Sequence, residues 1–311
     1  MNLLILNKFP DWNKVSADLE RHNKLYRNTN VIIHGITNYS YVPMHDTTLT
    51  VKYAFKGDEY YVTNNCKFRV NNNNYLVINA RKKYESYIDS GQNVESLAVF
   101  FSPKFASDAY SSLKNSSEGI QEEILRDGEL FTFFEKLYSA DNHIVPILNV
   151  IRNSILDKTT ERSRISELLL ILMDNLLTLQ NEQFKEINSL EYKKRSTREE
   201  LYKRLNNAKD YILSCYEKDI TLDDLSKVAS LESHYLLREF KKYFCTTPHK
   251  YLTTIRLKEA GKLLTETLKP VSEVSCLVGF EYLSSFTNLF TKHFRMSPLK
   301  YRENNYIKSQ Y

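Results

Sequence analysis

Two stretches near the C-terminal end of the sequence share one pattern about fifty positions apart, Leu225–Phe244 and Val274–Phe294. In each, a short apolar helix is expected to precede a tight turn and a second helix, whose buried side chains recur at i, i+4 and i+8. The recurring residues are Leu236, Phe240 and Phe244 in the first stretch and Phe286, Phe290 and Phe294 in the second. The pattern predicts tandem helix-turn-helix units, whose outer faces are free to enter a DNA major groove.

The charge distribution agrees with a polyanionic partner. From Arg198 onward the chain carries 19 Lys and Arg against 14 Asp and Glu, a balance of +5, and the preceding residues carry 24 against 24. The whole net charge of +5 therefore lies in the segment with the repeat, as phosphate binding requires.

Length and composition point to two globular domains in 311 residues. The apolar run Leu168–Met173 is far shorter than the roughly 20 residues that span a bilayer, and the first residues lack a basic signal-peptide region. We therefore expect a cytoplasmic protein without a membrane partner. The four cysteines are scattered, with no zinc-ligand spacing, so we expect reduced thiols, no metal and no cofactor.

The N-terminal half alternates short β-rich runs with Asn and Gly. The runs are 49–55, 60–62, 67–70, 75–78 and 97–101, and the tetrad Asn71–Asn74 is typical of a hairpin turn. Many short strands of this kind predict a small barrel or sandwich. The fold class is therefore α+β, with a small N-terminal β-barrel or sandwich and a C-terminal all-α domain.

From about residue 118 the pattern becomes helical. An apolar stripe packs either on the barrel of the same chain or at a dimer seam, and both remain open: Ile165, Leu168, Leu169, Leu172 and Leu176. We predict a β-rich domain over 1–117, a helical segment over 118–192, a linker over 193–200 and a DNA-binding domain over 201–305. The two helix-turn-helix units are expected at about 221–244 and 270–294.

Each second helix has an outward face that is predicted to contact DNA. Base readers are expected near the helix N-termini and phosphate contacts further along. The predicted base readers are His234, Leu237, Arg238, Leu283, Ser284, Thr287 and Asn288; the predicted phosphate contacts are Lys241, Lys242, Thr291 and Lys292. Arg238 suits guanine O6 and N7, or else a phosphate, and Asn288 suits adenine.

The segment from about Leu201 to Arg302 resembles the DNA-binding domain of the AraC/XylS family of bacterial transcription regulators. The resemblance is carried by residues that recur across the segment: Leu222-Asp-Asp-Leu225, Ala229, Leu236-Leu-Arg-Glu-Phe-Lys-Lys242, Pro248, Tyr251, Arg256, Ala260, Leu263, Leu264, Val278-Gly-Phe280, Phe286, Phe290, Met296-Ser-Pro298, Tyr301 and Arg302. It implies two readers joined by a central helix and set in successive major-groove segments roughly 34 Å apart. Cys245 stands where glycine is commoner in the family.

The N-terminal half resembles, more weakly, the cupin-like effector-binding barrel of the same family with its dimerisation helices. This implies a homodimer, RNA polymerase as a partner, activation rather than repression, and a small-molecule or anionic effector. Six residues are candidates for effector binding: Tyr39, Tyr41, Lys52, Tyr53, Phe55 and Arg81. Core packing, or for Arg81 a solvated loop, is the alternative for each of them.

Two other functions compete with this one. A metal-dependent cupin enzyme needs clustered His and carboxylate ligands, but the barrel region supplies only His34 and His45, with no H-x-H. No other catalytic motif is present, so the chain is not expected to be an enzyme. A regulator controlled by a protein partner, with a ligand-free barrel, stays open as the second alternative.

Overall fold

The structure of this chain, a computed structural model, describes residues 2–12, 15, 18–63, 66–116, 132–140, 143–157, 159–188 and 194–306. It divides into two units, Met1–Lys203 and Arg204–Tyr311, which are described separately.

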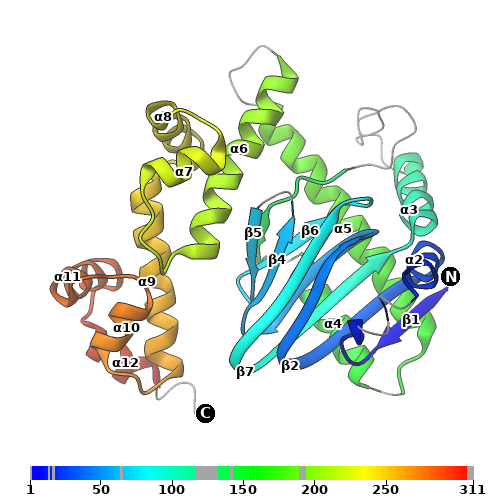
Figure 1. Cartoon of the computed structure of the whole chain (residues 1–311), viewed down its shortest axis with the longest axis horizontal. Helices are drawn as coiled ribbons and strands as arrows, with labels where there is room; N and C mark the ends of the chain where they lie inside the picture. The colour runs from blue at the N-terminus through cyan, green and yellow to red at the C-terminus, as the bar shows by residue number, and fades with distance from the viewer. Residues whose placement is uncertain are drawn as a thin grey trace. The chain divides into compact units, whose positions relative to one another are not determined.

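The first unit is built on a mixed sheet (Figure 1). Its strands are β1 (Leu3–Leu6), β2 (Asn30–Asp46), β3 (Leu49–Lys56), β4 (Glu59–Thr63), β5 (Cys66–Val70), β6 (Asn74–Ile78), β7 (Lys83–Phe101) and β8 (Leu137–Ser139). The order is β1-β2-β7-β3-β6-β8, and β4 pairs with β5 and β7. Only β1 and β2 run parallel among the described pairs, which do not close the sheet into a barrel.

The predicted β-rich runs all lie in strands of this sheet, and the predicted hairpin turn is confirmed. At that turn the Asn74 amide donates a hydrogen bond to the Asn71 carbonyl at 3.3 Å. The sequence pattern missed β1, the long β2 and the helix α2 (Leu19–Asn28). It also missed β8, which lies within the segment 118–192 that was predicted to be helical.

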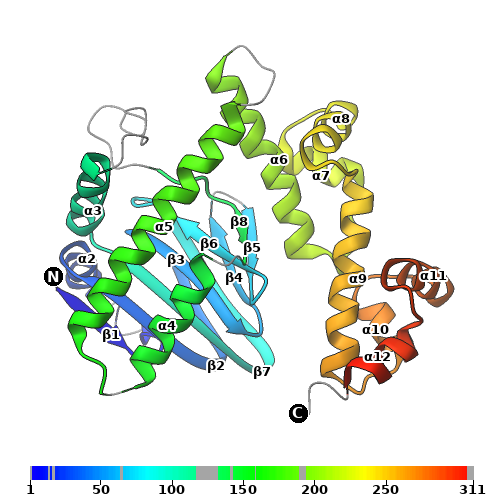
Figure 2. The same cartoon turned by 180° about the vertical axis from the view of Figure 1, so that it is seen from behind.

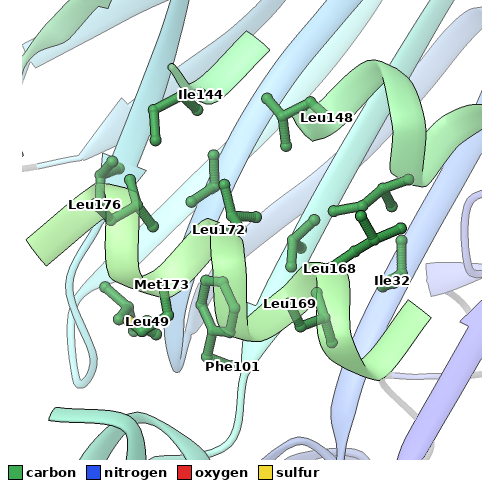
Figure 3. Close-up of a cluster of buried hydrophobic side chains, with 14 of the residues drawn as sticks. Ile32, Leu49, Phe101, Ile144, Leu148, Leu168, Leu169, Leu172, Met173 and Leu176 are labelled. Atoms are coloured by element: carbon green, nitrogen blue, oxygen red, sulfur yellow. The ribbon is translucent and has the colours of Figure 1, made fainter. Parts of the chain in front are cut away.

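Helices cover one face of the sheet. Figure 2 shows α4 (Ile144–Leu156) and α5 (Arg162–Asn188) lying across it, and α3 (Pro103–Ser116) follows β7. The predicted stripe on α5 is buried there: Ile165, Leu168, Leu169, Leu172 and Leu176. These side chains pack with Ile32, Leu49 and Phe101 of the sheet (Figure 3). They form the core of their own unit, whereas Leu170 and Ile171 of α5 are exposed.

The second unit contains two short helix pairs along one long helix. Its helices are α6 (Arg195–Cys215), which begins in the first unit, α7 (Leu222–Ala229), α8 (Ser233–Phe244), α9 (Pro248–Glu266), α10 (Val271–Leu277), α11 (Leu283–Phe294) and α12 (Pro298–Tyr306). In Figure 1, α7 and α8 lie toward one end of α9, and α10, α11 and α12 toward the other. Residues 195–200 of the predicted linker belong to α6.

Local sequence explains where these helices begin and how closely they pack. Thr221 and Asp224 form the capping box of α7, and Pro248 occupies the first turn of α9. A Cβ at Gly261 would lie 3.2 Å from the Phe294 ring, so the glycine permits close packing on α9. Within the described part of the chain, no helix has the length and apolarity needed to cross a membrane.

Candidate nucleic-acid interface and cavity

The first helix-turn-helix unit consists of α7, a turn and α8. Ser230 ends α7 in the left-handed region, with φ 51°. The Glu232 carboxylate then caps α8, accepting hydrogen bonds from the amides of His234 at 3.1 Å and Tyr235 at 2.9 Å. These hydrogen bonds hold the pKa of Glu232 below its usual value. The carboxylate therefore fixes the N-terminal turn of α8, where the predicted base readers begin.

The exposed face of α8 carries most of the predicted contacts in this unit. Leu225, Ala229, Leu236 and Phe240 are buried between the helices. His234, Arg238, Lys241 and Lys242 are exposed, and Leu237 is half-buried. This face is basic and accessible, as phosphate and base contacts require.

Arg238 is an exposed charged residue of α8 with two defined neighbours, Glu239 and Tyr235. Its Nε lies 2.9 Å from the Glu239 carboxylate, and its guanidinium lies 5.0 Å from the centre of the Tyr235 ring. The Arg238 side chain is 68% exposed, while that of Glu239 is 6% exposed. Glu239 therefore orients the guanidinium from below without covering its outer edge.

The second helix-turn-helix unit, α10 and α11, repeats this arrangement, but the exposed face of α11 is nearly neutral. Phe286 and Phe290 of α11 are buried, as the repeat predicted. The predicted contacts with exposed side chains are Leu283, Ser284, Asn288, Thr291 and Lys292. Thr287 is half-buried, and its hydroxyl donates to the Leu283 carbonyl at 2.9 Å, as the Thr291 hydroxyl does to Thr287 at 2.7 Å. Both hydroxyls keep acceptor capacity only.

Two arginines fasten the chain that precedes each helix-turn-helix unit. Arg256 of α9 donates to the carbonyls of Tyr216 and Lys218, both at 2.7 Å. Arg302 of α12 donates to the carbonyls of Leu264, at 3.1 Å, and Lys269, at 2.5 Å. Charge-assisted bonds to two carbonyls hold each segment in one position. The sequence periodicity did not predict this role for either arginine, because the carbonyls that accept their hydrogen bonds lie about 40 residues away in sequence.

A cavity of about 520 Å³ lies in the first unit, on the strands. Its buried polar lining includes Thr48, Lys52, Glu59, Tyr84 and Ser86. Aromatic side chains complete it, including Phe9, Trp12, Tyr61 and Phe100. This size and mixture of surfaces are typical of small-molecule sites.

The structure brings together only two of the six predicted effector residues, Lys52 and Arg81, in this cavity. Tyr53 and Phe55 pack in the helix-covered core, because side chains alternate between the faces of β3. Tyr39 and Tyr41 are 69% and 52% exposed on β2 and line a separate shallow groove.

Sequence reasoning missed several cavity residues: Trp12, Thr48, Glu59, Tyr61 and Tyr84. A signal was present in β4, where Glu59 and Tyr61 alternate onto one face.

Lys52 is the most unusual charged group in this cavity. Its ammonium donates to the Tyr84 hydroxyl at 3.0 Å and lies 4.0 Å from the centre of the Phe100 ring. Burial lowers the pKa of Lys52 to about 7, although the Glu59 carboxylate opposes this shift. Burial likewise raises the pKa of Glu59, although the charge of Lys52 and nearby hydroxyls act to lower this pKa.

Within the described ranges, no group of three or more His, Cys, Asp and Glu side chains is placed to hold a metal ion. His34 instead contacts Glu95, and His45 contacts the Pro43 carbonyl. The four cysteines are free thiols.

Comparison with known proteins places the second unit in a family. Residues 225–304 match the profile of a helix-turn-helix domain. The lactose operon transcription activator of Staphylococcus xylosus is 28% identical over 191 residues, which cover 58% of this chain and 66% of that protein. This match is longer than the second unit and therefore includes part of the first.

Further similarities concern the C-terminal part. The probable transcriptional regulator LumQ of Photobacterium leiognathi is 38% identical over 93 residues, 30% of this chain and 38% of that protein. The C-terminal domain of the response regulator yesN from Fusobacterium nucleatum is 33% identical, with a TM-score of 0.30, over 30% of this chain and 93% of that structure.

The chain thus spans less than two thirds of the length of these curated relatives. Both relatives are named for the regulation of transcription. With two helix-turn-helix units on one central helix, the C-terminal part of this chain is a helix-turn-helix domain of the AraC type.

Proposed function

We propose that this chain regulates transcription by binding double-stranded promoter DNA through the N-terminal turns of α8 and α11. The observation that carries the proposal is the repeat itself: α9 holds two helix-turn-helix units, and each presents an exposed outer face. Two readers on one helix suit successive major-groove segments, roughly 34 Å apart.

The two readers have different roles in this proposal. His234, Leu237 and Arg238 of α8 read base edges, with Arg238 on a guanine, while Lys241 and Lys242 contact phosphates. On α11, Leu283, Ser284, Thr287 and Asn288 read bases, and Thr291 and Lys292 contact phosphates. Because α11 has fewer cationic groups at its outer face, it contributes less of the affinity and more of the sequence preference.

The first unit is the regulatory part of the protein in this proposal. We infer that it has a cupin-like fold, with most of its strands within residues 1–117, and that its cavity binds a small effector. Support comes from the cavity volume of about 520 Å³ and from its buried polar lining. Effector binding changes how the DNA-binding domain, 201–305, meets its site. Control by a protein partner remains the alternative.

The relative named for activation of the lactose operon favours an activator. An activator in the bacterial cytoplasm has RNA polymerase as a further partner, with the protein on the nucleoid when it is bound to DNA.

Dimerisation is proposed through helices of the segment 118–192. The buried stripe on α5 belongs to the core, so the outer surface of α4 and α5 is the better candidate for the interface. Exposed apolar side chains on these helices are Val150, Leu156, Leu170 and Ile171. In a homodimer interface, apolar side chains of this kind are buried away from water.

Sequencing of DNA recovered with the tagged protein from cells tests the DNA-binding proposal. We expect discrete sites that contain two short boxes about one helical turn apart. Arg238→Ala and Asn288→Ala should remove or alter these sites. Lys258→Ala, which deletes an exposed charge of α9, is the matched control and should leave them unchanged. Diffuse recovery without a shared motif, in the wild type and both variants alike, would refute sequence reading by these helices.

A further inference from the structure

The cavity of the first unit contains two oppositely charged buried residues, Lys52 and Glu59. We propose that the cavity binds an uncharged ligand whose hydrogen-bond acceptor, such as an amide or hydroxyl oxygen, is seated on the Lys52 ammonium, and that Glu59 selects against carboxylates. This inference rests on the proposed function insofar as the cavity is the regulatory site. It assigns Glu59 a role in ligand specificity and decides between neutral and anionic effectors.

The Lys52 ammonium has donor capacity that the protein does not use. Lys52 is 2% exposed, and the described residues offer its three N–H groups one hydrogen bond, to the Tyr84 hydroxyl at 3.0 Å. The rest of its surroundings are aromatic, with the Phe100 ring at 4.0 Å and the Tyr61 ring at 5.4 Å. Because a buried donor without an acceptor is costly, a ligand oxygen at this point is favoured.

A second polar atom in the cavity lacks a partner. The Thr48 hydroxyl is buried and makes no hydrogen bond within the described residues. Thr48 lines the same cavity as Lys52. Native proteins leave few buried polar atoms unpaired, and the exceptions are often ligand or water sites. Two unsatisfied groups in one cavity therefore indicate a ligand with more than one polar atom.

The charge of the buried pair limits what that ligand can be. The pair has no net charge whether Lys52 and Glu59 are both ionised or the proton has moved from one to the other. Hydroxyls of Ser96, Tyr61 and Ser86 lie near the Glu59 carboxylate and favour its ionised form. A ligand carboxylate beside Lys52 would leave the buried group of three with one uncompensated negative charge, which burial strongly disfavours. An uncharged hydrogen-bond acceptor leaves the net charge of the buried group at zero.

Other charged residues of the cavity do not change this balance. Arg27, Asp46 and Arg81 also line it, but all three are exposed, so water and salt screen them. The body of the ligand meets Phe9 and Trp12, which supply apolar surface. The preferred ligand is thus neutral, with polar atoms at its buried end and an apolar or stacking body.

Fluorescence of Trp12 tests this inference directly, because it is the single tryptophan of the chain and lines the cavity. Octanamide and octanoate are matched probes that differ in charge and not in length. They would be titrated into the full-length protein at pH 6, where Lys52 is protonated. We expect a saturable change with octanamide and at least tenfold weaker binding of octanoate.

Two variants test whether Lys52 and Glu59 cause the selectivity for octanamide over octanoate. Glu59→Gln should reduce or reverse the preference for octanamide. Without the Glu59 carboxylate, the carboxylate of octanoate would neutralise the positive charge of Lys52. Lys52→Met should weaken octanamide binding at least tenfold. Lys67→Met is the matched control: Lys67 lies over the Tyr60 ring, 4.3 Å from its centre, and does not line the cavity.

Equal or tighter binding of octanoate by the wild-type protein would overturn the inference, and so would the absence of a saturable response to either probe. This comparison needs no substitution, so a variant that fails to fold does not affect it. Sequence-specific DNA binding is measured separately. If DNA binding is retained and the selectivity is absent, only the ligand inference fails.

Discussion

Arg152 of α4 forms a two-point ion pair with Glu95 of β7, with Nη2 2.8 Å from Oε2 and Nε 2.5 Å from Oε1. The His34 ring nitrogen Nε2 lies 2.9 Å from the same Oε1, so Glu95 joins two strands and a helix. Burial acts to raise the pKa of the Glu95 carboxyl, but the hydrogen bonds from Arg152 and His34 outweigh it and hold this pKa below its usual value. The carboxylate thereby links α4 to the sheet that carries the cavity.

This link predicts acid sensitivity of the first unit. Because the folded pKa of Glu95 is lowered, its contribution to stability is complete above the usual range, about 4.3, and is lost as the pH falls through the lowered value. We expect Glu95→Gln to reduce the free energy of unfolding by about 1–3 kcal/mol at pH 7. Urea unfolding should show the two proteins converging as the pH falls below 4. A difference that stays constant from pH 7 to pH 3 would contradict this account.

Two neighbouring residues of α5 distinguish the hydrophobic core of the first unit from the proposed dimer interface. Leu172 is fully buried, so Leu172→Ala should cost about 2–5 kcal/mol of folding free energy at any protein concentration. Ile171 is 48% exposed, so Ile171→Glu should change monomer stability by only about 0.5 kcal/mol. If the outer face of α5 is the dimer interface, sedimentation should show this variant as a monomer. A variant that sediments as a dimer would place the interface elsewhere.

The end of α8 predicts a stabilising substitution. Cys245 has φ 55°, in the left-handed region where a side chain is strained and glycine is not. Cys245→Gly should raise the free energy of unfolding by about 0.5–1 kcal/mol in thermal or urea unfolding. Cys245→Ala keeps the Cβ and is the matched control. An equal gain from both substitutions would show that the thiol, and not the backbone, sets the effect.

The helical repeat could be predicted from sequence because its information is local. Aromatic residues four positions apart, such as Phe286 and Phe290, specify a buried helix face, and both are buried. Thr221 and Asp224 likewise sit three positions apart and cap their own helix. In contrast, Arg256 was assigned no partner, because its acceptors are defined only once the chain has folded.

The cavity depends on strand register and was therefore predicted only in part. Lys52 was named, but the strand alternation places its neighbours Tyr53 and Phe55 on the other side of the sheet. Glu59 reaches Lys52 through pairings of β3, β4 and β7 that no local pattern encodes. Trp12 comes from a segment in which no regular periodicity marks it as a cavity residue.

Arg238 distinguishes base reading from phosphate contact. Arg238→Lys keeps the positive charge but loses the two-point guanidinium geometry. If Arg238 reads a guanine, both Arg238→Lys and Arg238→Ala should weaken binding to a specific site by about 1–3 kcal/mol and relax the preference at one base pair. If Arg238 contacts only phosphate, the lysine variant should bind nearly as well as wild type to all sequences. Fluorescence anisotropy on matched duplexes with single base changes separates the two.

The most direct test of the two-reader account is the spacing of its DNA boxes. Fluorescence anisotropy would measure the affinity of the full-length protein for a recovered site and for versions with about 5 or 10 base pairs inserted between the boxes. The 19-residue α9 fixes the distance between the readers. Both insertions should lower affinity at least tenfold, the shorter by turning one box to the opposite face and the longer by moving it about 34 Å away. Undiminished affinity for either insertion would contradict joint reading by α8 and α11.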